Sequence, residues 1–212
     1  PGGKPDSPYI NISTPLHRLT GIQHDQIMAQ ATQIAKLDKV LEFRLDSGLW
    51  LRQYPGQVSK RFYSRHPAKL FDRNAKILRM HGIKTITVDN FFRIPVKKIS
   101  AATYFVPKGE MLSKLPVKQI PLQSLAGFIA MLHEKGFDFS NPSADMFTLD
   151  TEDASFAILD PTGFILRKSP TNLRDRRKSV TKLIQNLGLE SQDSDFFYSN
   201  YTQAAGLGLT EI

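Results

Sequence analysis

The sequence predicts an α+β fold in which a mostly β first lobe precedes a reduced, helical second lobe. Short runs of apolar and β-branched residues, separated by turn signals, dominate the chain up to residue 107. Beyond that point, apolar residues recur at helical spacing over 121–135 and 172–187. Segregated strands and helices are typical of α+β folds, and we expect a hinge between the two lobes. The predicted domains are a flexible tail over 1–17, a first lobe over 18–107 and a second lobe over 108–212.

The first lobe is predicted to contain two helices among its strands. Apolar residues at helical spacing predict a short helix over 24–35. A strongly basic helix is predicted over 60–80, with a break near Pro67 and a stop at Gly82. Strands are predicted over 40–45, 49–54, 85–88, 91–94 and 101–106, with turns at 46–48, 89–90 and 107–109.

The second lobe is predicted to be built mainly from helices. Pro121 near the start and Gly136 after the end delimit the helix over 121–135, which a linker or short helix over 112–119 precedes. A last helix is expected in the aromatic stretch "FFYSNYTQAAGLGL". His133 lies in the last turn of its helix, and we expect its imidazole to cap backbone carbonyls rather than to bind a metal.

Composition limits the classes of function. The 212 residues contain no cysteine, which excludes disulfides, thiol catalysis and thiolate metal sites. The formal net charge of +8 favours anionic partners such as nucleotide phosphates or an anionic membrane surface. The longest apolar helical stretch, 122–132, is too short to span a bilayer. With no visible signal peptide, we expect a cytoplasmic protein that could lie peripherally at the inner membrane.

Several common site motifs do not occur. The five histidines show no H-E-x-x-H or other metal spacing, and neither G-x-S-x-G nor a Walker A loop is present. Aromatic and basic residues alternate around Arg61, but without the pattern of an RNA-binding module, which disfavours nucleic acid as partner.

The stretch from the end of the 121–135 helix to Asp160 has the order of parts found in a kinase. There, a helix leads to the loop that carries the catalytic base, then to a β-hairpin, then to an aspartate that binds Mg²⁺. Here the helix ends "AMLHEKG", a loop follows, the hairpin is "MFTLDTEDASFAIL", and Asp160 comes directly after it. As an alternative, Asp160 before Pro161 simply starts a turn. The acidic residues 150–153 are expected to form a solvated hairpin tip.

The chain resembles the lipopolysaccharide core kinase family of the protein-kinase-like fold, and within it the branch of toluene tolerance proteins. The resemblance covers residues 16–187 and depends on the order and spacing of the stretches "VLEFRLDSGLWLRQY", "LFDRNAKILRMHGIKT", "TYFVPKGEML", "AGFIAMLHEKGFDFSN" and "FAILDPTGFILRK". It implies a two-lobed fold with a nucleotide-type cleft, ATP and Mg²⁺ as cofactors, and a lipopolysaccharide precursor or the anionic inner-membrane surface as partner.

The resemblance also assigns candidate site residues. In the loop, Phe139 falls at the position of the catalytic-loop histidine, Asn141 at that of the catalytic aspartate and Met146 at that of the metal-binding asparagine, whereas Asp160 matches outright. Arg52, or less well Lys60, falls at the lysine of the third strand, and Asn74 at its helical glutamate partner. The hinge segment that would bind the nucleotide base contains Phe105, Val106 and Lys108.

These departures from the kinase motifs predict low phosphotransfer activity. The carboxamide of Asn141 has no useful basicity, and the thioether of Met146 is a poor ligand for Mg²⁺. Asp138 and Asp145 flank the loop and are candidates for a substitute base. Without a glutamate at position 74, Arg52 would lack the usual ion pair. We therefore expect a weakly active kinase or a pseudokinase. The alternative is a basic module that docks on an anionic membrane or nucleic acid through residues 60–79 without using nucleotide.

Overall fold

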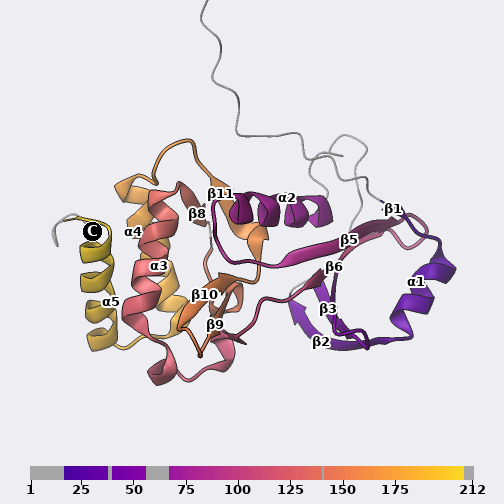
Figure 1. Cartoon of the computed structure of the whole chain (residues 1–212), viewed down its shortest axis with the longest axis horizontal. Coiled ribbons are helices and arrows are strands. Elements are labelled where there is room, and N and C mark those ends of the chain that lie inside the picture. Colours follow the sequence, from indigo (N-terminus) through magenta and orange to yellow (C-terminus); the bar gives the residue numbers. More distant parts are fainter. Residues whose placement is uncertain (1–16, 38–39, 56–66, 140, 208–212) are drawn as a thin grey trace, which may run out of the picture. The chain divides into compact units, whose positions relative to one another are not determined.

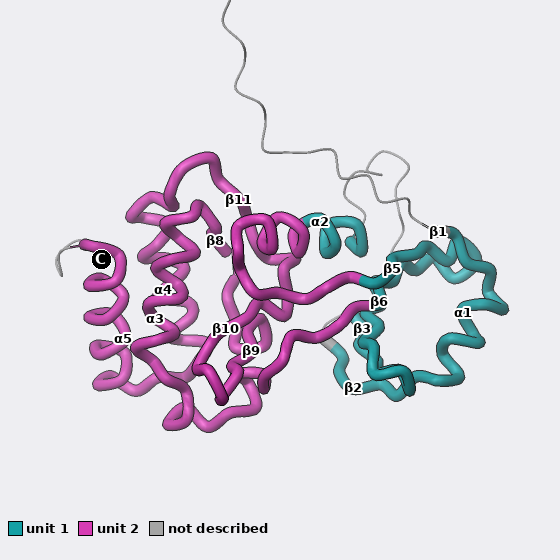
Figure 2. The backbone as a smooth tube through the Cα atoms, in the orientation of Figure 1, with its two compact units in different colours: residues 1–73, 89–103 teal, residues 74–88, 104–212 magenta. Residues whose placement is uncertain are grey.

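The computed structural model describes residues 17–37, 40–55, 67–139 and 141–207, and it confirms the predicted α+β class. The chain divides into two compact units (Figure 1, Figure 2). Unit 1 takes the chain up to residue 73 together with 89–103, and unit 2 takes 74–88 and the chain from 104 onward. Three elements cross between the units: α2 (Pro67–Met80), β5 (Thr87–Ile94) and β6 (Ile99–Phe105). The predicted tail, apart from residue 17, lies outside the described residues.

A six-stranded sheet with the order β1-β5-β6-β4-β3-β2 forms the centre of the first half of the chain. Its other strands are β1 (His17–Arg18), β2 (Ala31–Leu37), β3 (Val40–Leu45) and β4 (Trp50–Pro55). The predicted hairpin is confirmed: β3 and β4 are antiparallel, and Gly48 in the turn has a φ of 84°, which favours glycine. Apolar side chains of the sheet form the core of unit 1, including Phe43, Leu51 and Phe92.

Helix α1 (Gly21–Met28) begins earlier and ends sooner than the helix predicted over 24–35. It begins with a capping box, in which the Thr20 hydroxyl accepts from the backbone of Gln23 and the Gln23 side chain accepts from the backbone of Thr20. The prediction for residues 31–35 was wrong because they pair with β3 as strand β2. Ile34 is 41% exposed, so its helical spacing did not mark a buried helix face.

Strand β5 runs without interruption through Asp89 and Asn90, where a turn was predicted. The two strands predicted over 85–88 and 91–94 are therefore mostly one strand. The chain turns instead after Pro95, with the backbone N–H of Lys98 donating to the Pro95 carbonyl at 3.2 Å. The described part of the basic helix is α2, which stops at Gly82 as predicted, with a φ of 73° there. Residues 60–66 lie outside the described part of the chain.

Unit 2 contains two small sheets. The first has the order β10-β9-β7 and includes the predicted hairpin, and the second pairs β11 with β8. The strands are β7 (Glu110–Met111), β8 (Phe137–Phe139), β9 (Phe147–Asp150), β10 (Ser155–Ile158) and β11 (Phe164–Leu166). The linker forms two short turns, η2 (Leu112–Lys114) and η3 (Val117–Gln119). The pair β8–β11 was not predicted, because each strand is only three residues long.

The three predicted helices of the second half are confirmed as α3 (Leu122–Glu134), α4 (Leu173–Leu187) and α5 (Ser191–Ala204), which lie side by side (Figure 1). Asn172 caps the start of α4 through the backbone N–H of Asp175 at 3.0 Å. The apolar faces of the helices and the hairpin form one core, which includes Leu125, Phe147, Leu183 and Phe197. In the described part of the chain, no helix combines the length and apolarity that a bilayer crossing requires.

His133 does not cap carbonyls, so that prediction was wrong. Its side chain is fully buried between the three helices, with Nδ1 2.6 Å from the Tyr201 hydroxyl and Nε2 2.9 Å from the Ser179 hydroxyl. Burial, with a smaller effect of nearby Arg176, lowers the pKa of His133 to about 3. Burial also raises the pKa of Tyr201 to about 12. The imidazole is thus a neutral link that joins α3 to α4 and α5.

Candidate functional site

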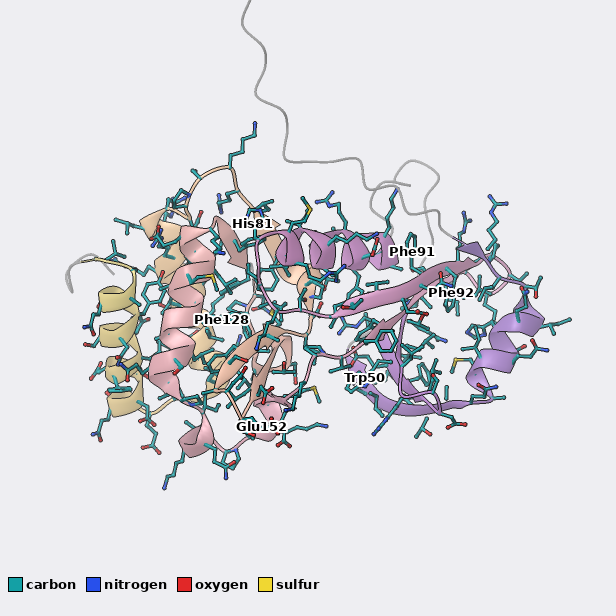
Figure 3. All side chains as sticks on the ribbon, in the orientation of Figure 1. Trp50, His81, Phe91, Phe92, Phe128 and Glu152 are labelled. Atoms are coloured by element: carbon teal, nitrogen blue, oxygen red, sulfur yellow. The ribbon has the colours of Figure 1, made fainter. Side chains whose placement is uncertain are left out.

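The hairpin β9–β10 brings residue 160 next to residue 146. The carbonyl of Met146 accepts a hydrogen bond from the backbone N–H of Leu159 at 2.8 Å and lies 3.4 Å from that of Asp160. Phe147 of β9 and Phe156 of β10 pack on Phe128 of α3, which anchors the hairpin to the helical core (Figure 3). Residues 146 and 160, which the resemblance assigns to the metal-ligand positions of a kinase, therefore lie side by side.

Asp160 makes a turn of its own. Its Oδ1 accepts from the backbone N–H of Thr162 at 2.9 Å and from the Thr162 hydroxyl at 2.5 Å, and it thereby caps the short helix η5 (Pro161–Gly163). The carboxylate is partly exposed. Turn formation and metal binding are compatible, because a carboxylate has more lone pairs than this turn uses. Mg²⁺ is commonly held by one or two carboxylates together with substrate phosphates and water. Asp160 fits that ligand set, whereas the buried thioether of Met146 does not.

Asn74 of α2 supports the segment that follows Asp160. Its side chain is buried, and Nδ2 donates to the carbonyl of Pro161 at 2.8 Å and lies 3.4 Å from that of Phe164. The side chain at position 74, which the resemblance assigns to the ion-pairing glutamate of a kinase, therefore binds backbone carbonyls. The carboxamide supplies donors that a glutamate could not.

Asp138 is held in an internal ion pair. Its Oδ1 accepts from the backbone N–H of Phe139, and its Oδ2 lies 2.8 Å from Nη2 of Arg167. The same nitrogen lies 2.7 Å from a carboxylate oxygen of Asp175. The Asp138 side chain is only 8% exposed. A carboxylate that is buried and already bound to a guanidinium is poorly placed to meet a substrate hydroxyl.

Asn141 and Asp145 line a pocket of about 400 Å³. Both side chains are exposed, unlike Asp138. The backbone between them is fixed by Asn186 of α4, whose Nδ2 donates to the carbonyl of Pro142. The structure therefore brings two of the three candidate catalytic residues to one cavity and places the third in the protein interior.

Arg52 has a glutamate partner, which corrects the expectation that it would lack one. The partner is Glu42 on the neighbouring strand, with Nε at 2.7 Å and Nη2 at 2.6 Å from the same carboxylate oxygen. Both side chains are nearly inaccessible, and the guanidinium lies 5.0 Å from the ring centroid of Phe71 on α2. The register could have revealed this pair: a turn centred on Ser47 places residues 42 and 52 directly opposite each other.

The connection that would cover the nucleotide phosphates in a kinase is very short. Strand β2 ends at Leu37 and β3 begins at Val40, and these two residues are paired in the ladder. Only two residues separate the strands, which leaves no room for a G-x-G-x-x-G loop. Lys60, the weaker candidate for the lysine position, lies outside the described residues.

The hinge segment is partly open. Phe105 is 52% exposed and Val106 is half-buried. Lys108 turns to the tip of the β9–β10 hairpin, where its ammonium contacts Glu152 and lies 3.9 Å from a carboxylate oxygen of Asp150. Glu152 at this tip is labelled in Figure 3. Residues 151–153 of the tip are exposed as predicted, whereas Asp150, predicted to be solvated with them, has a side chain that is only 14% exposed. The acidic side chains of the tip are ion-paired with Lys84 and Lys108. Lys108 is thus engaged within unit 2, and a contact to nucleotide stays a prediction.

Sequence reasoning missed three polar residues that hydrogen-bond to the candidate residues or to the loop: Glu42 in unit 1, and Arg167 and Asn186 in unit 2. Only Glu42 had a signal in the sequence, through the hairpin register. Arg167 contacts Asp138 across 29 residues of chain and Asn186 contacts Pro142 across 44, and no periodicity points to such contacts.

The chain has a strand-rich first part, a helix after the fourth strand, and a hairpin that ends at an aspartate. This order of elements, together with the similar solved structures, defines a protein-kinase-like fold. No family model matches the sequence, and no curated protein matches it. Solved structures do match.

An aminoglycoside-3'-phosphotransferase of type VIII superposes with a TM-score of 0.60 at 12% identity, covering 88% of this chain and 96% of that one. The aminoglycoside phosphotransferase APH(3'')-Id from Streptomyces rimosus gives 0.55 at 10% identity, with 88% and 90% covered. Monomeric WbdD gives 0.53 at 15% identity. The match to WbdD covers 79% of this chain but spans only 44% of the length of WbdD.

Proposed function

We propose that this chain is a kinase-like protein of the lipopolysaccharide kinase and toluene tolerance type, with a degenerate catalytic site. It binds a nucleotide with Mg²⁺ at Asp160 and transfers phosphate slowly or not at all. The observation that carries the proposal is the backbone junction between residues 146 and 160, supported from α2 by Asn74. A kinase-like backbone arrangement that lacks the usual catalytic side chains is what we expect of a kinase site that has lost activity.

The contacts of the individual residues support the loss of activity. Arg52 is buried against Glu42, so its guanidinium already has a full-charge partner. Asn141 cannot accept a proton, and Asp138 is held by Arg167. Asp145 is then the remaining candidate base of the loop. Losing a proper base alone costs about 10²- to 10⁴-fold in rate.

The substrate class is also a proposal. A sugar hydroxyl of a lipopolysaccharide precursor would accept the γ-phosphate of ATP if any transfer occurs. The net charge of +8 favours association with such an anionic precursor or with the anionic surface that contains it. Two of the structural neighbours are, by name, phosphotransferases.

A thermal-shift experiment with ATP and Mg²⁺ tests the nucleotide site. At about five times Kd, a ligand stabilises the folded state by about 1 kcal/mol, or roughly 2–4 °C for a chain of this size. We expect this shift in the wild type with Mg²⁺. We expect it to be lost in Asp160→Asn, which keeps the turn to Thr162 but removes the charge.

Asp195→Asn, an exposed carboxylate on α5, is the matched control and should shift like the wild type. No shift at millimolar ATP, or an equal shift in Asp160→Asn, would remove the nucleotide from the proposal. Steeply salt-dependent binding to anionic vesicles without any nucleotide shift would support the basic docking module instead.

A further inference from the structure

The pocket beside Asn141 and Asp145 has the make-up of a binding site for a small polar ligand. It lies entirely within unit 2 and has a volume of about 400 Å³, within the range of small-molecule pockets. One wall is apolar and comes from the segment of η2 and η3 and from the end of α4. The lining residues of that wall are Leu112, Leu115, Val117, Ile120 and Leu187.

Short polar side chains also line the pocket. Ser143 and Asn141 come from the loop, Ser113 comes from η2, and Asn186 comes from α4. Asn186 uses its Nδ2 on the carbonyl of Pro142, which fixes the carboxamide and leaves its oxygen as an acceptor. The serine hydroxyls and the carboxamides both donate and accept hydrogen bonds, and hydroxyl groups of a ligand do the same.

Asp145 gives the pocket its sign of charge. It is the single charged side chain among the lining residues, and within the described part of the chain it makes no ion pair. The chain as a whole is strongly basic, with a net charge of +8. A negative charge among the lining residues repels phosphates and attracts cations locally, since exposed charges more than a Debye length of about 8 Å away are largely screened.

We propose that this pocket binds a small polyhydroxylated molecule that carries a primary amine, with the ammonium at Asp145 and the hydroxyls against the carboxamides and serines. The ring or carbon backbone of the ligand would lie on the apolar wall. The proposal goes beyond the proposed function and does not rest on it, because an amine-bearing ligand differs from the anionic phosphate acceptor proposed above. Binding itself needs no nucleotide.

NMR titrations with three sugars test the charge preference. Glucosamine in mildly acidic buffer carries an ammonium, glucose is neutral and glucose 6-phosphate is anionic, while all three share the hydroxylated ring. We expect glucosamine to bind about 2- to 5-fold more tightly than glucose, as for an exposed ion pair, and glucose 6-phosphate to bind most weakly. Shifted resonances should come from the lining residues. Equal affinities, the reverse order, or no binding at tens of millimolar would overturn the proposal.

Two variants of Asp145 sharpen the test. In Asp145→Asn the preference for glucosamine should disappear, and in Asp145→Lys it should reverse in favour of glucose 6-phosphate. Asp145 is exposed, so the fold should tolerate both substitutions. Asp195→Asn serves as the control and should keep the wild-type preference. An unchanged preference in Asp145→Lys would contradict the assignment.

The same samples separate this proposal from the nucleotide site. Asp160→Asn should keep the sugar preference while losing the ATP shift. If ATP has no effect on the wild type but glucosamine still binds at Asp145, the kinase proposal fails and the pocket remains. If ATP acts and the sugars show no preference, the pocket proposal fails alone.

Discussion

Asp138 on β8 and Asp145 near the end of the loop that follows β8 use their carboxylates in opposite ways. Asp138 is buried, bonded to its own backbone and paired with Arg167. Asp145 is exposed at a pocket whose other polar groups face a ligand-sized space. The difference teaches that a polar residue near a kinase-like loop is not thereby catalytic. Its partners decide whether it stabilises the fold or remains open to a ligand.

The same division separates other polar residues. Arg52 and His133 belong with Asp138, because their partners are internal and their side chains are buried. Asn141 belongs with Asp145. Substitutions should therefore fall into two groups, with large losses of stability in the first and small ones in the second.

The largest effect is expected at Arg52. Replacing it with methionine leaves Glu42 buried without its guanidinium partner and removes the contact with Phe71, and the free energy of unfolding should fall by about 3–5 kcal/mol. Urea denaturation monitored by circular dichroism measures this loss. The double variant Glu42→Leu/Arg52→Met should recover a large part of it. A single variant as stable as the wild type would show that Arg52 is not committed to the fold.

Acid should weaken the helical core through His133. Its folded pKa of about 3 lies below its unfolded value of 6.5, so the unfolded chain binds a proton first. This stability is fully present above pH 6.5 and is lost as the pH falls toward 3, by about 1.4 kcal/mol per pH unit, or roughly 2–3 kcal/mol by pH 4.5.

Denaturation curves at several pH values provide the measurement for His133. In His133→Gln the slope of stability against pH should flatten between pH 6.5 and 4.5, whereas His81→Gln, at an exposed histidine, should keep most of the wild-type slope. Equal slopes in the wild type and His133→Gln would contradict a neutral buried imidazole.

The smallest effects compare Asp138 and Asp145 directly. Asp138→Asn keeps the bond to the backbone of Phe139 but loses the charge opposite Arg167, which is about a third exposed, so a loss of about 1–2 kcal/mol is expected. Asp145→Asn should change stability by less than about 0.5 kcal/mol. Chemical denaturation measures the free energy of unfolding of both variants. Similar losses in the two would contradict the different roles of Asp138 and Asp145.

Much of the fold could be predicted from the sequence because its signals are local. The hairpin at Gly48 and the helices over 121–135 and 172–187 have turn or cap residues at both ends, and all three are confirmed. Residues 31–35 were assigned to a helix because apolar spacing alone cannot tell a short helix from an edge strand. The ladder with β3 decided the outcome.

Only part of the candidate site could be predicted from local signals in the sequence. The position of Asp160 after the hairpin followed from the sequence order, and so did the weakness of the loop. What the sequence could not give is which carboxylate is buried. That depends on Arg167 and Asn186, which meet the loop only after the chain has folded. His133 shows the same limit, since its partners lie on two other helices.

The rate of ATP turnover tests the central claim that the kinase-like site is degenerate. Protein kinases turn over at about 1–100 s⁻¹. With Asn141 in place of a base and Arg52 buried against Glu42, we expect a rate at least about 10²-fold below that range, measured as phosphate release or transfer at saturating ATP and Mg²⁺. A rate within the range of ordinary kinases, lost in Asp160→Asn, would contradict the account.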